Sequence, residues 1–194
     1  MTITDIKQQV KRQDRYSIYV DGKYKFSLSE SELLKQQLRI GQEITDIEQI
    51  EQTALEDKAK MRAFDQLSRR PRSMWEMQEY LKRKGYEQEL VEKVLNMLST
   101  GGYLDDKKFA QAWVRNRRAT KSTSLRRLSQ ELRAKRVSDS VINEVLEEDE
   151  ADEKDVLEEL IEKKQKQTRY QDREKLLAYL LRQGFNYGDI KELI

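Results

Sequence analysis

The chain has 194 residues, with 38 Lys or Arg against 36 Asp or Glu, and it contains neither His nor Cys. Because these two residue types are absent, the sequence excludes a Ser-His-Asp triad, a thiol nucleophile, a disulfide framework and a Cys/His zinc site. One Pro, seven Gly and an excess of strong helix formers favour a mainly α-helical protein. No segment approaches the ~20 apolar residues that span a bilayer, and the polar start is unlike a signal peptide, so we expect a cytoplasmic protein with no membrane partner.

The N-terminal segment is the β-rich part of the chain. Residues 15–20 and 23–28 are rich in β-branched and aromatic residues, and they flank Asp21-Gly22, a pair that supplies the positive φ of a two-residue hairpin turn. Alternate residues of the second run, beginning with Tyr24, predict one apolar face. Residues 2–11 predict a third strand beside the hairpin.

Capping chemistry marks three helix starts. A Ser or Thr followed three residues later by Glu forms a capping box, in which the hydroxyl accepts a backbone N–H and the Glu binds the N–H of the cap residue. The three boxes are Ser29/Glu32, Thr45/Glu48 and Ser73/Glu76. The first helix is expected to run through Leu38 and end at Gly41, and Pro71 and Gly85 are expected to end the next two.

An internal repeat is the most informative pattern in the sequence. A shift of 51 residues, and then a further shift of 48, places apolar residues on apolar residues at six positions. The three copies are Met77, Leu81, Tyr86, Val91, Val94 and Leu95; Leu128, Leu132, Val137, Ile142, Val145 and Leu146; and Leu176, Leu180, Phe185, Ile190, Leu193 and Ile194. Gly85 recurs as Gly184, but Arg136 stands in the middle copy, where a left-handed cap costs a non-Gly residue about 1 kcal/mol.

Each copy is preceded by one more predicted helix, so the repeating unit is three helices. These preceding helices are expected over 46–69, 106–119 and 150–166. Units this small cover their apolar faces by stacking on neighbours, which predicts a mainly α tandem array of three three-helix repeats behind a small β-hairpin and helix extension. The expected domains are 1–44, 45–101, 102–148 and 149–194. A coiled coil is the alternative, but Gly and Pro interrupt the pattern too often for it.

Positive and negative charges are segregated along the chain. Residues 107–136 carry eleven Lys or Arg against one acidic residue, Glu131, whereas residues 143–162 carry eleven Asp or Glu against Lys154 alone. Salt screens exposed charges beyond about 8 Å, so a partner is expected to feel the two segments separately. A charge run is often only a solvated face, but solubility is served by mixed signs. The segregation therefore favours an interaction with nucleic acid, an acidic protein face, or both.

The candidate contact residues are the cations of the basic segment and a smaller group in the first repeat. Arg126 and Arg133 are expected on one flank of a helix over 122–135, with Arg127 on the far side. We expect all three to be free for a partner. The full candidate set is Arg115, Arg117, Arg118, Lys121, Arg126, Arg127, Arg133, Lys135, Arg136, Arg69, Arg70, Arg72, Lys82, Arg83 and Lys84.

Other conspicuous residues have structural explanations. Four aromatic residues lie among apolar helix positions or at turns, so we expect them to pack in the core rather than to stack on bases. They are Trp75, Tyr103, Phe109 and Trp113. Asp105-Asp106 precede an apolar helix and are expected to cap it rather than to hold a metal. We expect no cofactor, no metal ion and no catalytic residue.

Five short segments, taken in their order and spacing, carry a family resemblance. They are Ala63-Phe-Asp-Gln-Leu67, Arg70-Pro-Arg-Ser73, Leu81-Lys-Arg-Lys-Gly-Tyr86, Gly102-Tyr-Leu-Asp-Asp106 and Phe109-Ala-Gln-Ala-Trp-Val114. With them, essentially the whole chain resembles the RecX family of recombinase regulators. The N-terminal hairpin resembles an extension that many members carry, and the tandem three-helix repeats match the family architecture. The chain departs from the family pattern at Thr120-Lys-Ser-Thr-Ser124, which replaces a Gly-containing loop, and at Arg136, which replaces Gly.

The resemblance implies a non-enzymatic protein that binds the RecA recombinase filament on single-stranded DNA and lies in its groove. There it is expected to inhibit filament extension or promote disassembly, and so to modulate recombination, DNA repair and the SOS response. We expect a monomer. The alternative is a helical module that binds nucleic acid directly. An enzyme is a more distant alternative: Glu162-Lys163-Lys164 matches a fragment of metal-dependent nucleases, but no strand carboxylate precedes it.

Overall fold

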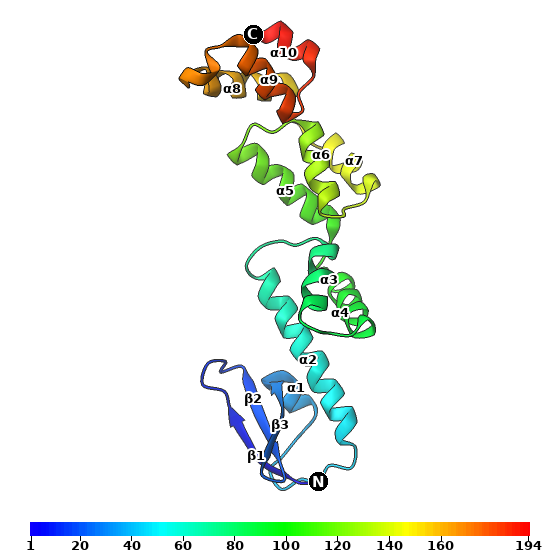
Figure 1. Ribbon diagram of the computed structural model, residues 1–194. Coiled ribbons are helices and arrows are strands. Elements are labelled where there is room, and N and C mark those ends of the chain that lie inside the picture. The colour runs from blue at the N-terminus through cyan, green and yellow to red at the C-terminus, as the bar shows by residue number, and fades with distance from the viewer. The chain divides into compact units, whose positions relative to one another are not determined.

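The computed structural model describes residues 1–194, with a small antiparallel sheet in the N-terminal part and helices in the rest (Figure 1). The strands are β1 Ile3–Gln8, β2 Arg15–Val20 and β3 Lys23–Ser29. The helices are α1 Glu30–Lys35, α2 Ile47–Leu67, α3 Met74–Arg83, α4 Gln88–Thr100, α5 Asp106–Thr120, α6 Leu125–Ala134, α7 Asp139–Glu147, α8 Glu153–Gln165, α9 Arg173–Gln183 and α10 Tyr187–Leu193, with a 3-10 turn, η1 Thr168–Tyr170, after α8. The predicted mainly α fold with a β extension is confirmed.

Two compact units divide the chain. Unit 1 comprises residues 1–70 and 77–101, and unit 2 comprises residues 71–76 and 102–194. Unit 1 therefore holds the sheet, α1, α2, α4 and all of α3 except its first turn. That first turn belongs to unit 2, together with α5 to α10.

The predicted hairpin is confirmed. In the sheet, β2 lies between β1 and β3 and is antiparallel to both. Asp21 and Gly22 connect β2 to β3 with φ of +49° and +79°, the pair of left-handed residues that a two-residue turn needs. The third strand is also present, but it ends at Gln8, because residues 9–14 form the loop that returns the chain to β2.

A β-bulge changes the face on which Tyr24 lies. Ile18 pairs with Phe26, and Tyr19 pairs with Tyr24. Lys25, between the two pairs, is therefore an extra residue in β3. Because side chains alternate along a strand, an extra residue moves its neighbour to the opposite face. Phe26 is buried, whereas Tyr24 is 56% exposed and packs edge-on against Tyr19. The prediction of a single apolar face is wrong for Tyr24.

In two of the predicted capping boxes the serine hydroxyl makes the predicted hydrogen bond to the backbone. The Ser29 hydroxyl accepts the N–H of Glu32 at 3.3 Å, and the Ser73 hydroxyl accepts the N–H of Glu76 at 3.2 Å. The N–H of Ser29, however, donates to Asp57 in α2 and not to Glu32. A carboxylate distant in the sequence thus takes the place of the local one.

The boundaries of α1 and α2 differ from the prediction. α1 ends at Lys35, short of Leu38, because Gln37 adopts a left-handed conformation with φ of +51°. α2 is capped by Asp46, whose carboxylate accepts the N–H of Gln49 at 3.0 Å, so the prediction of Thr45 as cap is wrong by one residue.

A buried ion pair ties the sheet to α2. Arg15 in β2 and Asp57 in α2 are 3% and 8% exposed, and Arg15 Nη1 lies 3.1 Å from Asp57 Oδ2. The carboxylate also accepts the N–H and the hydroxyl of Ser29 at 2.8 and 2.6 Å. Arg15 Nη2 donates to the carbonyl of Ser27 at 2.9 Å. Because β3 is an edge strand, these bonds satisfy backbone groups that no neighbouring strand could reach.

The repeat positions read from the sequence form the helical cores. All six positions of the first copy are buried, as are the first five of the second, and Leu146 is half-buried. In the third copy the first four are buried, and Leu193 and Ile194 are half-buried. Helices α5 to α7 and α8 to α10 each gather around one such core (Figure 1). The predicted three-helix repeats are confirmed.

Two N-cap serines in unit 2 each donate a further hydrogen bond to a backbone carbonyl of another helix. The Ser73 hydroxyl, before α3, donates to the carbonyl of Lys135 at 2.9 Å. The Ser124 hydroxyl, before α6, donates to the carbonyl of Gln183 at 2.7 Å. Both carbonyls lie at the C-terminal end of a middle helix, α6 or α9. Each serine therefore caps the middle helix of its own repeat and also bonds the C-terminal end of the middle helix of the next repeat.

A carboxylate accompanies each of these serines. Asp106, in the first turn of α5, accepts the N–H of Met74 at 2.8 Å, and Glu153, in the first turn of α8, accepts the N–H of Leu125 at 3.1 Å. Burial raises the pKa of both carboxyl groups, and these backbone hydrogen bonds only partly oppose it. The same polar contact thus recurs at the N-termini of α3 and α6.

Gly184 is required at its position for two reasons, and we expect Gly184→Ala to destabilise unit 2 by about 2–3 kcal/mol. Its φ is +93°, and an added Cβ would lie 2.8 Å from the hydroxyl oxygen of Ser124, so the methyl group adds a clash to the backbone strain. Gly85, with φ of +80° and open space around it, is the matched control and should cost about 1 kcal/mol as Ala. Urea unfolding of both variants measures the difference. Equal costs would show that the Ser124 contact carries no weight.

Candidate interaction surface

Most of the predicted contact residues lie on α5, on α6 and in the loop between them. Arg115, Arg117 and Arg118 are in the second half of α5, Lys121 follows it, Arg126, Arg127 and Arg133 are in α6, and Lys135 and Arg136 follow α6. The structure separates these side chains into those with carboxylate partners and those without. Only the second kind can offer its full charge to another molecule.

Arg118 belongs to the interior of unit 2. Its Nε and Nη2 donate to Asp149 Oδ2 at 2.8 and 2.6 Å, and its Nη1 donates to the carbonyl of Thr123 at 2.6 Å. The side chains of Arg118 and Asp149 are 13% and 10% exposed. A guanidinium with this many internal partners is unavailable to another molecule, so we assign Arg118 a structural role.

Lys107 also joins the basic segment to the acidic one. Its Nζ lies 2.7 Å from Glu144 Oε1 and 2.9 Å from Glu148 Oε1, and these hydrogen bonds raise the pKa of Lys107. Gln111, one turn later in α5, donates to Glu148 at 2.9 Å. The expectation that a partner feels the two charge segments separately is therefore wrong along this side of α5.

Glu131 collects a second group of polar contacts. Its Oε2 accepts from Arg117 Nε at 2.6 Å and from Trp113 Nε1 at 2.8 Å, and the Arg117 guanidinium lies 4.5 Å from the Trp113 ring centre. Burial alone would raise the pKa of Glu131, but the hydrogen bonds from Arg117 and Trp113 outweigh it and lower the pKa. Lys135 is likewise held, at 2.6 Å from Glu76.

The three arginines expected to be free on α6 differ from one another. Arg133 pairs with Asp139 at 2.7 Å, and both side chains are more than half exposed, so this pair is weak. Arg127 Nε is 3.7 Å from Glu131. Arg126 is exposed and has no ion pair in the structure. Arg126 thus has no internal ion pair, whereas the expectation of a free side chain is wrong for Arg133, whose partner lies six residues further along the chain.

Four predicted contact residues of the basic segment 107–136 are exposed without a carboxylate partner, and we name these four the open cations. They are Arg115, Lys121, Arg126 and Arg136. In the first-repeat group, Arg69, Arg70, Lys82, Arg83 and Lys84 are exposed and Arg72 is half-buried. Arg136 has φ of +58°, so it occupies the left-handed position predicted from the alignment with Gly85.

Two lysines outside the predicted set line the same cavity as two cations that belong to the set. Lys163 and Lys164, in the last turn of α8, line one cavity of about 540 Å³ together with Lys121 and Arg127. Sequence reasoning missed this group because both lysines stand next to the acidic segment and look like its counter-charges. Their place at a helix C-terminus, where lysines are common, gave no further signal.

The aromatic residues predicted to pack in the core and the acidic residues predicted to cap α5 agree only in part with the structure. Phe109 is buried and packs against the half-buried Trp113. Trp75 and Tyr103 are 37% and 61% exposed, so their assignment to the core is wrong; both stand where a helix begins or a turn ends, at the surface. Asp105 caps α5 by accepting the backbone N–H groups of Lys107 and Lys108, which confirms its predicted role.

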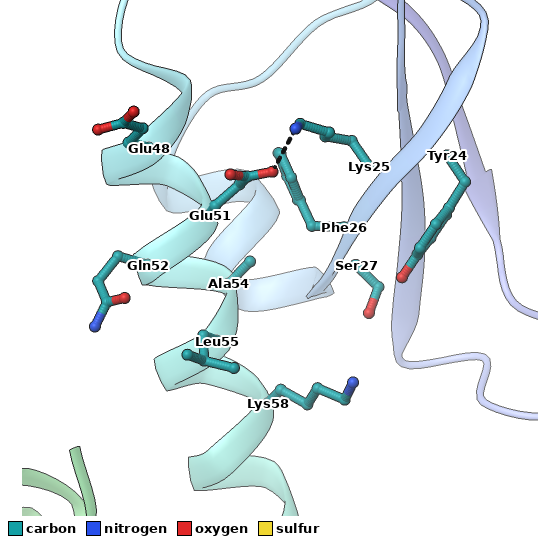
Figure 2. Close-up of a pocket in the computed structure, with 10 residues that line it drawn as sticks. All are labelled: Tyr24, Lys25, Phe26, Ser27, Glu48, Glu51, Gln52, Ala54, Leu55 and Lys58. Atoms are coloured by element: carbon teal, nitrogen blue, oxygen red, sulfur yellow. Dashed lines mark ion pairs between the residues drawn. The ribbon is translucent and has the colours of Figure 1, made fainter. Parts of the chain in front are cut away.

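A second hollow lies between β3 and α2 in unit 1 (Figure 2). Lys25 and Glu51 face each other across it, 2.9 Å apart, and Leu55 lies further along α2. An exposed edge strand can accept an added strand. Here the bulge at Lys25 and the bonds to Ser27 and Ser29 protect β3, so this hollow is a weaker candidate site than the basic cavity.

No helix of the chain is both long enough and apolar enough to cross a bilayer.

Three family models match parts of the chain. Residues 1–45 match the regulatory protein RecX N-terminal domain, residues 59–98 match the first three-helix domain of RecX, and residues 105–146 match the second. The chain is 34% identical to the regulatory protein RecX of Bacillus licheniformis over 97% of its own length and 74% of that protein. It is 40% identical to the regulatory protein RecX of Halalkalibacterium halodurans. That match covers 74% of this chain and 56% of that protein.

Solved structures agree with these matches. A crystal structure of regulatory protein RecX superposes with a TM-score of 0.71 at 28% identity, covering 99% of this chain and 98% of that one. A RecX structure from Lactobacillus salivarius gives a TM-score of 0.62 at 22% identity over 71% of this chain and 93% of that one, and supports the fold alone.

Proposed function

The chain belongs to the RecX family of regulatory proteins, and from this premise we propose that it regulates the RecA recombinase by binding its filament on single-stranded DNA. It acts without catalysing a reaction and as a monomer in the cytoplasm. Through the filament it modulates recombination, DNA repair and the SOS response. The observation that supports this proposal is the group of open cations on and beside α5 and α6.

The open cations suit a large anionic partner. Arg115, Lys121, Arg126 and Arg136 keep their full charge because no internal carboxylate offsets it. Charge of one sign on a surface raises the rate of encounter with a partner of the opposite sign. A filament presents both acidic protein surface and DNA phosphates, repeated along its length.

Tandem three-helix repeats allow several weak contacts to act together. Once one repeat has bound, the next meets its own site at a high effective concentration, so the total affinity exceeds that of any one contact. A protein that occupies the groove across neighbouring recombinase subunits competes with the addition of the next subunit. Inhibition of filament extension or promotion of disassembly follows from this competition alone.

The test compares recombinase ATPase rate and filament length on single-stranded DNA with and without the protein. We expect inhibition by the wild type and a roughly tenfold higher concentration requirement for Arg115→Glu/Arg126→Glu, which reverses two open cations. The matched control, Lys11→Glu/Lys191→Glu, reverses two exposed lysines elsewhere and should inhibit like the wild type. No inhibition by the wild type would refute the function, and unchanged inhibition by the first variant would remove Arg115 and Arg126 from the interface.

The alternative function is direct binding to nucleic acid without the recombinase. Contact with five or six phosphates would then make log K fall with log salt at a slope of about −5 on bare duplex DNA. Binding to bare duplex DNA, measured over a salt series beside the filament experiment, separates the two functions.

A further inference from the structure

A basic cavity lies between the second and third three-helix repeats, within unit 2. It has a volume of about 540 Å³, and its walls come from the α5–α6 loop, α6, α8 and α9. Pockets of 300–1,000 Å³ are the usual size for a small ligand or a single group of a larger one. The residues that decide its chemistry are Lys121, Arg127, Glu131, Lys163, Lys164 and Tyr179.

Four cations face one carboxylate in this cavity. The carboxylate is Glu131, and its Oε2 already accepts from Arg117 and Trp113, which lie outside the cavity lining. Arg127 is 3.7 Å from the other oxygen, too far for a hydrogen bond. Glu131 is thus the single carboxylate among the lining residues, and Lys163 is paired with Glu159 outside the lining.

The lysines are positioned by their neighbours. Glu159 accepts from Lys163 at 3.0 Å and from the hydroxyl of Ser122 at 2.8 Å, so one carboxylate joins α8 to the α5–α6 loop. Lys164 Nζ lies 4.8 Å from the ring centre of Tyr179. Lys121 is exposed and has no internal partner. Two lysines of the cavity are thus oriented before any ligand arrives, and the third is open.

An aromatic face lies beside these charges. Tyr179 lines the cavity and is half-buried, and Tyr170 packs against it with ring centres 4.9 Å apart. Sites for single-stranded nucleic acid combine cations that follow the backbone with aromatic rings on which bases stack. An acidic peptide would use the cations but gives no role to the ring.

We propose that this cavity binds the phosphate groups of single-stranded nucleic acid, with Lys121, Arg127 and Lys164 as the contacts. A base stacks on Tyr179 in place of the Lys164 ammonium, which turns from the ring to a phosphate. The proposal rests on the proposed function, because it assigns these residues to the DNA strand within the filament. A single strand can place one phosphate in a concave site, whereas duplex DNA presents a rigid convex surface.

Fluorescence anisotropy with a labelled oligothymidylate tests the proposal on the full-length chain. In the wild type we expect log K to fall linearly with log salt. In Lys121→Gln/Lys164→Gln we expect at least a tenfold loss of affinity at low salt and a salt slope smaller by about 1.4, since each phosphate contact on a single strand contributes about 0.7. Circular dichroism checks that the variant is folded.

The matched control is Lys11→Gln/Lys191→Gln, which removes two positive charges at exposed positions outside the cavity. Its affinity and salt slope should equal those of the wild type. Equal losses in the two double variants would overturn the proposal, because net charge and not the cavity would then govern binding. Absence of binding by the wild type at low salt would overturn it as well.

Two further measurements separate this proposal from the proposed function. Tyr179→Leu should bind oligothymidylate less tightly but poly-glutamate equally well, and equal oligothymidylate affinity would overturn the stacking role. If Lys121→Gln/Lys164→Gln keeps its oligothymidylate affinity but loses recombinase inhibition, the cavity contacts protein and the proposal fails while the function stands. If the cavity variant loses oligothymidylate binding and the wild type does not inhibit the recombinase, the cavity stands and the function fails.

Discussion

Replacing Asp57 with Ala is expected to destabilise unit 1 by about 3–5 kcal/mol, the cost of removing one partner of a buried ion pair. The Arg15 guanidinium, 3% exposed, would keep its charge without a carboxylate beside it. The N–H and hydroxyl of Ser29 would lose their acceptor at the same time. One side chain thus supports β2, the end of β3 and the start of α1.

The measurement is urea unfolding, combined with hydrogen exchange to localise the loss to the sheet and α2. Asp65→Ala is the matched control: Asp65 also lies in α2 and pairs with an arginine, Arg12, but both side chains are more than a third exposed. It should cost less than about 1 kcal/mol. Arg15→Met/Asp57→Leu should regain much of the lost stability, and a double variant no better than Asp57→Ala would contradict this account.

Local chemistry in the sequence was sufficient for much of the fold. Asp21-Gly22 predicts the hairpin because few residue pairs accept two positive φ angles. The six apolar repeat positions predict the helical cores because helical periodicity fixes which side chains share a face. Arg136, placed by the repeat alignment on a glycine position, does adopt a left-handed conformation. Each of these features depends on residues close together in the chain.

What the sequence could not show are contacts between distant residues. Asp57 bonds Ser29 across 28 positions, and it replaces the local Glu32 that a capping box predicts. The bulge at Lys25 depends on the pairing of β3 with β2, and a one-residue slip is invisible to a pattern of alternation. The same holds for the cap serines: Ser124 is recognisable as an N-cap, but its bond to the Gln183 carbonyl, 59 residues away, is not.

The candidate surface shows this limit most clearly. A count of charges along the chain treats every arginine alike, but the fold brings Arg118 to Asp149 and Lys107 to Glu144 and Glu148. The acidic segment therefore neutralises part of the basic one within unit 2. The charge available to a partner is concentrated in the open cations and in the cavity of Lys121, Arg127, Lys163 and Lys164.

Arg118→Gln is expected to destabilise unit 2 by about 3 kcal/mol. It leaves the Asp149 carboxylate, 10% exposed, without its guanidinium, and it removes the bond to the Thr123 carbonyl. Trp113 lies in unit 2 and its indole N–H bonds Glu131, so its fluorescence reports the unfolding of this unit. Arg126→Gln, the matched control on an exposed and unpaired side chain, should change stability by less than about 0.5 kcal/mol.

The pair of variants also separates structure from recognition. If Arg118 is structural and Arg126 is a contact, Arg118→Gln should inhibit the recombinase normally at temperatures well below its own unfolding transition and lose activity only as unit 2 unfolds. Arg126→Gln should show the reverse, with unchanged unfolding and weaker inhibition at every temperature. An Arg118→Gln protein that is fully folded and inactive would instead place Arg118 at the interface, and its bonds to Asp149 would then have to open when the partner binds.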